Sequence, residues 1–124
     1  MTQTALVIED NENNMELITF ILETNGYSTM RAENGRDGIY AALNHQPDFV
    51  LLDIQLPDMD GSEVLHAIRA DVNGINLPVI AVTSYAMSGD RERLLAQGCT
   101  GYLEKPIDPC TIIDSVRSIL KTPS

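Results

Sequence analysis

Short apolar runs of strand length recur along the 124-residue chain, and segments with helical spacing separate them. The second run is the weakest; the runs are Thr4–Ile8, Ser28–Ala32, Asp48–Leu52, Pro78–Val82 and Thr100–Glu104. Most are too apolar to leave one face of a sheet in water, which is typical of parallel strands covered on both faces. A strict alternation of such strands with helices predicts an α/β domain whose parallel sheet lies between two layers of helices.

The segments between the runs carry ordinary signals of helix ends. Apolar spacing and flanking Gly or Pro residues predict helices over 13–25, 35–45, 62–70 and 88–97. In the last helix, Asp108 is the expected N-cap and Pro109 the first helical residue. Right-handed crossovers then favour the doubly wound, flavodoxin-like strand order 2-1-3-4-5. We expect a single domain over residues 1–124, without an output domain.

The charge of the chain limits its partners. Eighteen acidic and eight basic side chains give a formal net charge of −10. This is the wrong sign for binding a phosphate backbone or an anionic membrane, so we expect no direct nucleic-acid partner and no membrane association. The N-terminus has no basic segment followed by a long apolar one, and no apolar run approaches the ~20 residues of a membrane helix. We therefore expect a cytoplasmic protein.

Polar residues with complementary chemistry follow the apolar runs. In open α/β sheets, ligands bind beyond the carboxyl ends of the strands. The residues expected at these ends are Glu9, Asp10, Asp53, Thr83, Ser84, Lys105 and Pro106. Two carboxylates ~5 Å apart repel by roughly 3 kcal/mol at an effective dielectric constant of ~20, so three of them need a cation. Lys105 supplies one positive charge, and Mg²⁺, which prefers oxygen ligands and phosphate, suits the remainder.

One of these carboxylates is a candidate nucleophile. Asp side chains can form aspartyl phosphates, and Asp53 ends the central run opposite the acidic pair. Mg²⁺ and Lys105 would then neutralise the phosphoryl oxygens, while the Thr83 hydroxyl donates to a further oxygen. The sequence therefore favours phosphoryl chemistry at this edge of the sheet.

Four blocks of sequence carry a family resemblance. In order, "VIED", "LLDIQLPDMDG", "VIAVTSYA" and "GYLEKP" resemble the signature blocks of response-regulator receiver domains of two-component signalling. The stretches "EDNENN" and "AMSGDRERLLAQGCTGYLEKPI" are most similar to CheY-like single-domain receivers of the DivK type and to hybrid-kinase receivers. The resemblance covers essentially the whole chain.

The resemblance implies roles for the residues around the proposed acceptor. Asp53 would accept a phosphoryl group from a phosphohistidine. Asp10, Asp53 and the backbone carbonyl of Gln55 would bind Mg²⁺, with Glu9 acting mainly through water. Gln55 and Tyr85, each two residues beyond a site residue, would modulate hydrolysis. A bulky ring at Tyr85 leads us to expect a long-lived phosphoryl group.

The resemblance also implies a switch. Thr83, Ser84 and Lys105 would contact the phosphoryl group, and Tyr102 would turn inward when Thr83 moves. The bond between Lys105 and Pro106 would be cis. The donor would be a histidine kinase or a histidine phosphotransfer protein. A downstream effector protein or kinase would read the fourth helix, fifth strand and fifth helix of an otherwise monomeric protein, which is not a turnover enzyme.

Two other functions fit the same sheet order less well. Phosphatases of the haloacid-dehalogenase type carry Asp-x-Asp or Asp-x-Thr at the nucleophile. Here Gln55 stands two residues after Asp53, where that motif has its second Asp or its Thr, and the chain has no room for a cap domain. A flavodoxin-like FMN carrier needs a phosphate loop rich in Ser, Thr and Gly after the first strand. The acidic "EDNENN" segment lacks one and repels phosphate.

Overall fold

The computed structural model describes residues 2–84 and 88–121. This part of the chain forms a parallel sheet in the order β2-β1-β3-β4-β5, which confirms the predicted α/β, flavodoxin-like fold. The strands are β1 (Thr4–Ile8), β2 (Ser28–Ala32), β3 (Phe49–Asp53), β4 (Val79–Thr83) and β5 (Gly101–Glu104). Strand β2 gives the weakest sequence signal because it is an edge strand, paired only with β1 and partly exposed.

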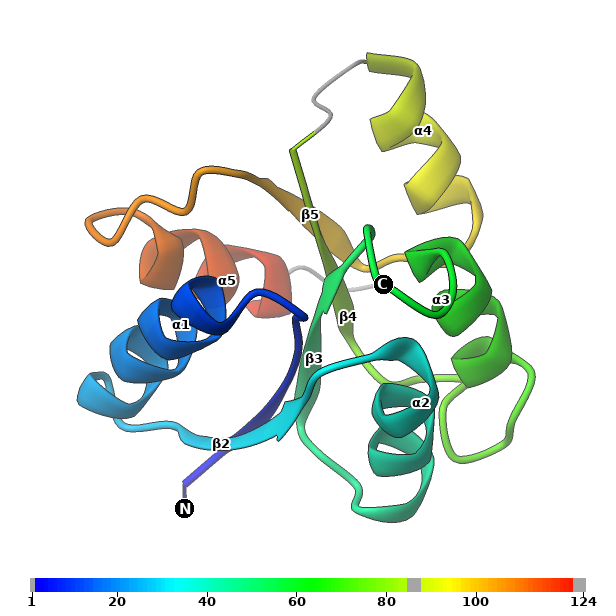
Figure 1. Cartoon of the computed structure of the whole chain (residues 1–124), viewed down its shortest axis with the longest axis horizontal. Coiled ribbons are helices and arrows are strands. Elements are labelled where there is room, and N and C mark those ends of the chain that lie inside the picture. The colour runs from blue at the N-terminus through cyan, green and yellow to red at the C-terminus, as the bar shows by residue number, and fades with distance from the viewer. Residues whose placement is uncertain (1, 85–87, 122–124) are drawn as a thin grey trace.

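Helices cover both faces of the sheet. They are α1 (Glu12–Thr24), α2 (Gly35–Asn44), α3 (Gly61–Arg69), α4 (Ser88–Ala96) and α5 (Ile112–Lys121). Helices α1 and α5 lie on one face, and α2, α3 and α4 lie on the other (Figure 1). None of the described helices has both the length and the apolar composition that a membrane span requires.

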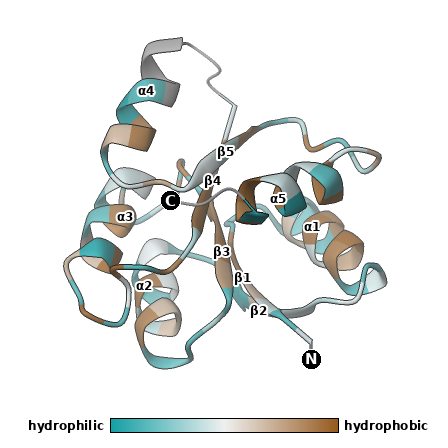
Figure 2. Cartoon of the chain, turned by 180° about the vertical axis from the view of Figure 1, so that it is seen from behind, coloured by the Kyte–Doolittle hydropathy of each residue, from teal (hydrophilic) through white to brown (hydrophobic). Residues whose placement is uncertain are grey.

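Alternate residues of the central strands enter two separate cores. Phe49 and Leu51 pack with residues of α1 and α5, whereas Val50 and Leu52 pack with residues of α2 and α3. All four are at most 1% exposed. Figure 2 shows the resulting apolar sheet between the helix layers. Burial on both faces is the physical reason for the continuous apolar runs.

Strands β3 and β4 each begin and end one residue later than predicted. Asp53 is the last residue of β3, where it pairs with Val82, and Thr83 is the last residue of β4. The backbone N–H of Ile54 still donates to the carbonyl of Val82 at 3.1 Å. Both polar side chains are therefore held by the ladder of the sheet instead of by a loop.

The last helix begins later than predicted, although its predicted cap is present. The Asp108 carboxylate accepts a hydrogen bond from the Cys110 N–H at 2.9 Å, and its carbonyl accepts one from the Ile112 N–H at 3.0 Å. Pro109 lies in a turn, and regular helix begins at Ile112. The predicted starts of α2 and α4 are confirmed, and the other predicted limits of α1 to α4 differ by one residue from those observed.

Candidate functional site

Three carboxylates converge at the carboxyl ends of β1 and β3. Glu9 and Asp10 follow β1, and Asp53 ends β3, which pairs directly with β1. Each of the three offers an oxygen, and these oxygens lie within 4.8 Å of one another. Glu9 and Asp53 are only 1% and 3% exposed, whereas Asp10 is exposed. The arrangement brings together the acidic residues that the sequence analysis singled out.

Lys105 joins this cluster from the end of β5. Its Nζ lies 3.1 Å from Glu9 Oε1 and 3.2 Å from Asp53 Oδ2. The Lys105 backbone N–H donates to the carbonyl of Thr83 at 2.8 Å, and the peptide bond to Pro106 is cis. One ammonium group therefore contacts two buried carboxylates from different strands.

The cluster shifts the acid–base properties of its members. The pKa of Glu9 is raised from 4.5 to about 7; burial is the largest cause, Asp53 also raises the pKa, and Lys105 lowers it. Burial by itself lowers the pKa of Lys105, but the attraction of Asp53 and Glu9 outweighs burial and raises it. The site is therefore short of positive charge near neutral pH.

The donor set fits a hard divalent cation such as Mg²⁺. Glu9 Oε1 is a buried oxygen without a hydrogen-bond partner among the described residues, because its contact with Lys105 has the distance of an ion pair but not hydrogen-bond geometry. A single ammonium also leaves the three carboxylates with net negative charge. Carboxylate oxygens in this number and spacing are suitable Mg²⁺ ligands, and Asp10 and Asp53 can supply them at the open side of the cluster.

Most of the remaining predicted site residues lie on β4, on β5 or directly after β3. The Gln55 N–H donates to Asp53 Oδ1 at 3.0 Å, and the Ser84 hydroxyl donates to the side-chain oxygen of Gln55 at 3.4 Å. Thr83 is buried at the end of β4. Tyr102 is half-buried on β5, and its hydroxyl donates to Glu104 at 2.8 Å. Tyr85 lies outside the described residues.

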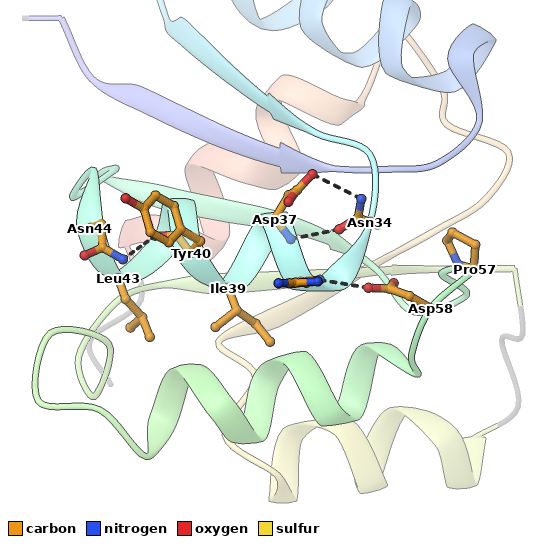
Figure 3. A pocket seen from close by; sticks show the side chains of 9 residues that line it. Asn34, Asp37, Ile39, Tyr40, Leu43, Asn44, Pro57 and Asp58 are labelled. Atoms are coloured by element: carbon orange, nitrogen blue, oxygen red, sulfur yellow. Dashed lines mark hydrogen bonds between the residues drawn. The ribbon is translucent and has the colours of Figure 1, made fainter.

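Asp58 makes contacts that sequence reasoning missed. Its carboxylate accepts hydrogen bonds from the N–H groups of Gly35 at 2.8 Å and Arg36 at 3.0 Å, at the start of α2. A hollow of about 940 Å³ runs along α2, and Pro57 and Asp58 line one end of it (Figure 3). The only signal in the sequence is an acidic residue shortly after β3. Its partner becomes evident only when the fold brings the two segments together.

Gly61 holds the segment after β3 close to the sheet. Its N–H donates to the Ile54 carbonyl at 2.8 Å, and an added Cβ would lie 2.5 Å from the Ile54 Cα. Because this neighbour is backbone, Gly61→Ala should lower the free energy of unfolding by about 2 kcal/mol in urea titrations. Gly35→Ala is the comparison, since its nearest neighbour is the flexible Met59 side chain. Equal losses in the two variants would contradict this prediction.

Comparisons with known proteins agree with this geometry. Residues 5–117 match the family model of the response regulator receiver domain. The polar-differentiation response regulator DivK of Brucella ovis is 42% identical over 120 residues, covering 97% of this chain and 98% of that protein. DivK of Brucella anthropi has the same identity and coverage.

Solved structures of receiver domains and chemotaxis proteins are similar to this chain in fold. The chemotaxis protein CheY4 of Vibrio cholerae superposes with a TM-score of 0.90 over 96% of this chain and 99% of its own, and its 24% identity makes it a likeness of fold alone. The receiver domain of a Pseudomonas aeruginosa sensor histidine kinase is 32% identical, with a TM-score of 0.88 over 98% of this chain and all of its own. That structure has a magnesium ion coordinated in its active-site cleft. The present chain, with the same fold and an acidic cluster at the strand ends, belongs to the response regulator receiver domain family of two-component signalling.

Proposed function

We propose that Asp53 is the phosphoacceptor of this response regulator and that its phosphorylation depends on Mg²⁺. The observation that carries the proposal is the state of the Asp53 carboxylate. It is 3% exposed at the end of the central strand, contacts Lys105 at 3.2 Å through Oδ2 and accepts the Gln55 N–H through Oδ1. Glu9 also contacts Lys105 and accepts a backbone N–H, that of Asn11 at 3.4 Å, but Asp53 is the carboxylate that ends the central strand β3.

The proposed reaction transfers a phosphoryl group from a histidine nitrogen. An Asp53 oxygen forms a bond to phosphorus, the P–N bond breaks, and its electron pair returns to the imidazole of the donor. The hydrogen bond from Gln55 and the ion pair with Lys105 orient the carboxylate before the donor arrives. Lys105 and the Thr83 hydroxyl then stabilise charge on the phosphoryl oxygens.

Asp10, Asp53 and the carbonyl of Gln55 would hold the metal, and Glu9 would act through water. Bound Mg²⁺ would supply the positive charge that the acidic cluster lacks and draw the phosphoryl oxygens towards it. The proximity of the Asp10, Glu9 and Asp53 oxygens supports this ligand set. The magnesium ion in the active-site cleft of the Pseudomonas aeruginosa receiver domain supports the presence of a metal, without naming its ligands.

The proposed output follows from residues on β4 and β5. Phosphorylation draws in Thr83 and Ser84, and Ser84 leaves the side-chain oxygen of Gln55 to contact the phosphoryl group. Tyr102 turns inward and leaves Glu104, which changes the surface of α4, β5 and α5. Gln55 also influences hydrolysis of the aspartyl phosphate, because it lies beside Asp53.

We propose that the chain works as a single receiver domain and a monomer. Its phosphodonor is a histidine kinase or a histidine phosphotransfer protein, and a downstream effector protein or kinase reads the altered face. Its excess of acidic residues argues against direct binding to nucleic acid or membranes. The protein assists its own phosphorylation and dephosphorylation but does not turn over an external substrate. The DivK relatives, matched over almost their whole length, support this organisation.

Intact-protein mass after incubation with acetyl phosphate tests the proposal. The wild type should gain one phosphoryl adduct with Mg²⁺ and none with EDTA, and Asp53→Asn should gain none. Asp60→Asn is the matched control, because Asp60 lies in the same segment but is exposed and caps α3. It should be phosphorylated like the wild type. An adduct of the same yield on Asp53→Asn would refute the assignment.

A further inference from the structure

The segment between β3 and α3, residues 54–60, carries one of the proposed metal ligands on an exposed stretch of backbone. Gln55, Pro57 and Asp58 are exposed, whereas Leu56 and Met59 between and beyond them pack against the core. At one end, the Gln55 N–H is bonded to Asp53 Oδ1. At the other, Gly61 is bonded to the carbonyl of Ile54. Neither hydrogen bond involves Asp58, which lies in the exposed middle of the segment.

Asp58 attaches the middle of this segment to the start of α2. Its Oδ1 accepts the N–H of Gly35 at 2.8 Å, and its Oδ2 accepts the N–H of Arg36 at 3.0 Å. Figure 3 shows Asp58 facing the first turn of α2, beside Asn34. The N–H groups of a first helical turn have no partner within their helix, so they favour an acceptor from another segment. The same two hydrogen bonds lower the pKa of Asp58 and keep it an anion.

We propose that Asp58 is a positioning residue for the metal site: by fastening the segment after β3 to the first turn of α2, it keeps the backbone carbonyl of Gln55 directed at the cation. This inference rests on the proposed Mg²⁺ site. Its physical basis is geometric, because Gln55 lies only three residues from Asp58 along the chain. A metal ligand supplied by the backbone cannot turn independently, so its direction is set by whatever holds the neighbouring residues.

Partners that hold ligands in place affect metal affinity although they do not touch the metal. Without the bonds from Asp58, the segment keeps the hydrogen bonds at its two ends, the bridge between Gln55 and Asp60, and the packing of Leu56 and Met59, but it loses its attachment to the first turn of α2. The carbonyl of Gln55 would then sample several directions, and metal binding would have to restrict them. Part of the binding free energy would be lost to this ordering.

Calorimetric titration with MgCl₂ on the full-length, unphosphorylated chain tests this inference. Asp58→Asn preserves the shape of the side chain but removes its charge and one of its two acceptor oxygens. Asp37→Asn is the matched control, since Asp37 is also an exposed acid in the first turn of α2 but its side chain bonds to Asn34, not to the segment after β3. Both substitutions remove one negative charge near the start of the same helix. Urea titrations in EDTA establish that each variant is folded at the temperature of the titration.

We expect Asp58→Asn to raise the dissociation constant for Mg²⁺ by about tenfold and Asp37→Asn to change it by less than about twofold. Equal affinity of Asp58→Asn and the wild type would overturn the inference, as would an equal loss in both variants, which would indicate only long-range charge. If the wild type itself does not bind Mg²⁺, the proposed metal site fails, and this inference fails with it. A loss of Mg²⁺ affinity in Asp58→Asn but not in Asp37→Asn supports both the metal site and the positioning role of Asp58.

Discussion

Lys105→Met is expected to lower the free energy of unfolding by about 3 kcal/mol at pH 8 in EDTA. In the wild type, the Lys105 ammonium lies 3.1 Å from Glu9 Oε1 and 3.2 Å from Asp53 Oδ2. Both carboxyl groups are almost completely buried, and without Lys105 they face each other with no other ammonium or guanidinium contact among the described residues. Methionine fills a similar volume, and the loss therefore reports charge more than packing.

The loss should be smaller at pH 5. Glu9 has a pKa of about 7, so at pH 5 it carries a proton and only Asp53 depends on Lys105. Urea titrations at the two pH values measure the difference. Lys121→Met provides the control, because Lys121 is exposed at the end of α5 and should be nearly neutral. A loss that is the same at pH 5 and pH 8 would show that Lys105 acts by packing and not by charge.

The fold could be predicted because its strands are buried on both faces. Runs such as Phe49–Asp53 are apolar at nearly every position, and each is followed by a segment with helical spacing. Exact limits depend on hydrogen bonds that composition does not reveal. Asp108 was predicted to cap the last helix directly, but it caps a turn, and regular helix begins only at Ile112. Strand ends shifted by one residue because the ladder between β3 and β4 extends to Asp53.

The site was predictable to the extent that it lies at strand ends. Parallel strands bring Glu9, Asp53 and Lys105 to one edge of the sheet, and the ion pairs between them follow from this placement. The near-complete burial of Glu9 could not be predicted from sequence, because it depends on packing around the end of β1. The role of Asp58 was also out of reach, since its partners precede it by more than twenty residues. Contacts of this kind require the positions of two separate segments.

The burial of Glu9 should make the metal-free protein less stable as the pH rises. In the unfolded chain Glu9 loses its proton near pH 4.5, whereas in the folded chain it retains the proton up to about pH 7. Between these values the folded state binds the extra proton, so raising the pH favours unfolding. The contribution is complete below pH 4.5 and is lost as the pH rises through 7. It amounts to about 3 kcal/mol.

Glu9→Gln should remove this dependence. Glutamine has the same shape but no titrating proton, so the variant should gain about 3 kcal/mol relative to the wild type between pH 4 and pH 8, measured by urea titration in EDTA. Glu33→Gln, an exposed glutamate outside the site, should leave the pH profile unchanged. Saturating Mg²⁺ should flatten the wild-type profile, because a bound cation favours the ionised Glu9 carboxylate. A Glu9→Gln profile parallel to that of the wild type would mean that Glu9 is already ionised in the folded protein, and that Lys105 alone offsets its burial.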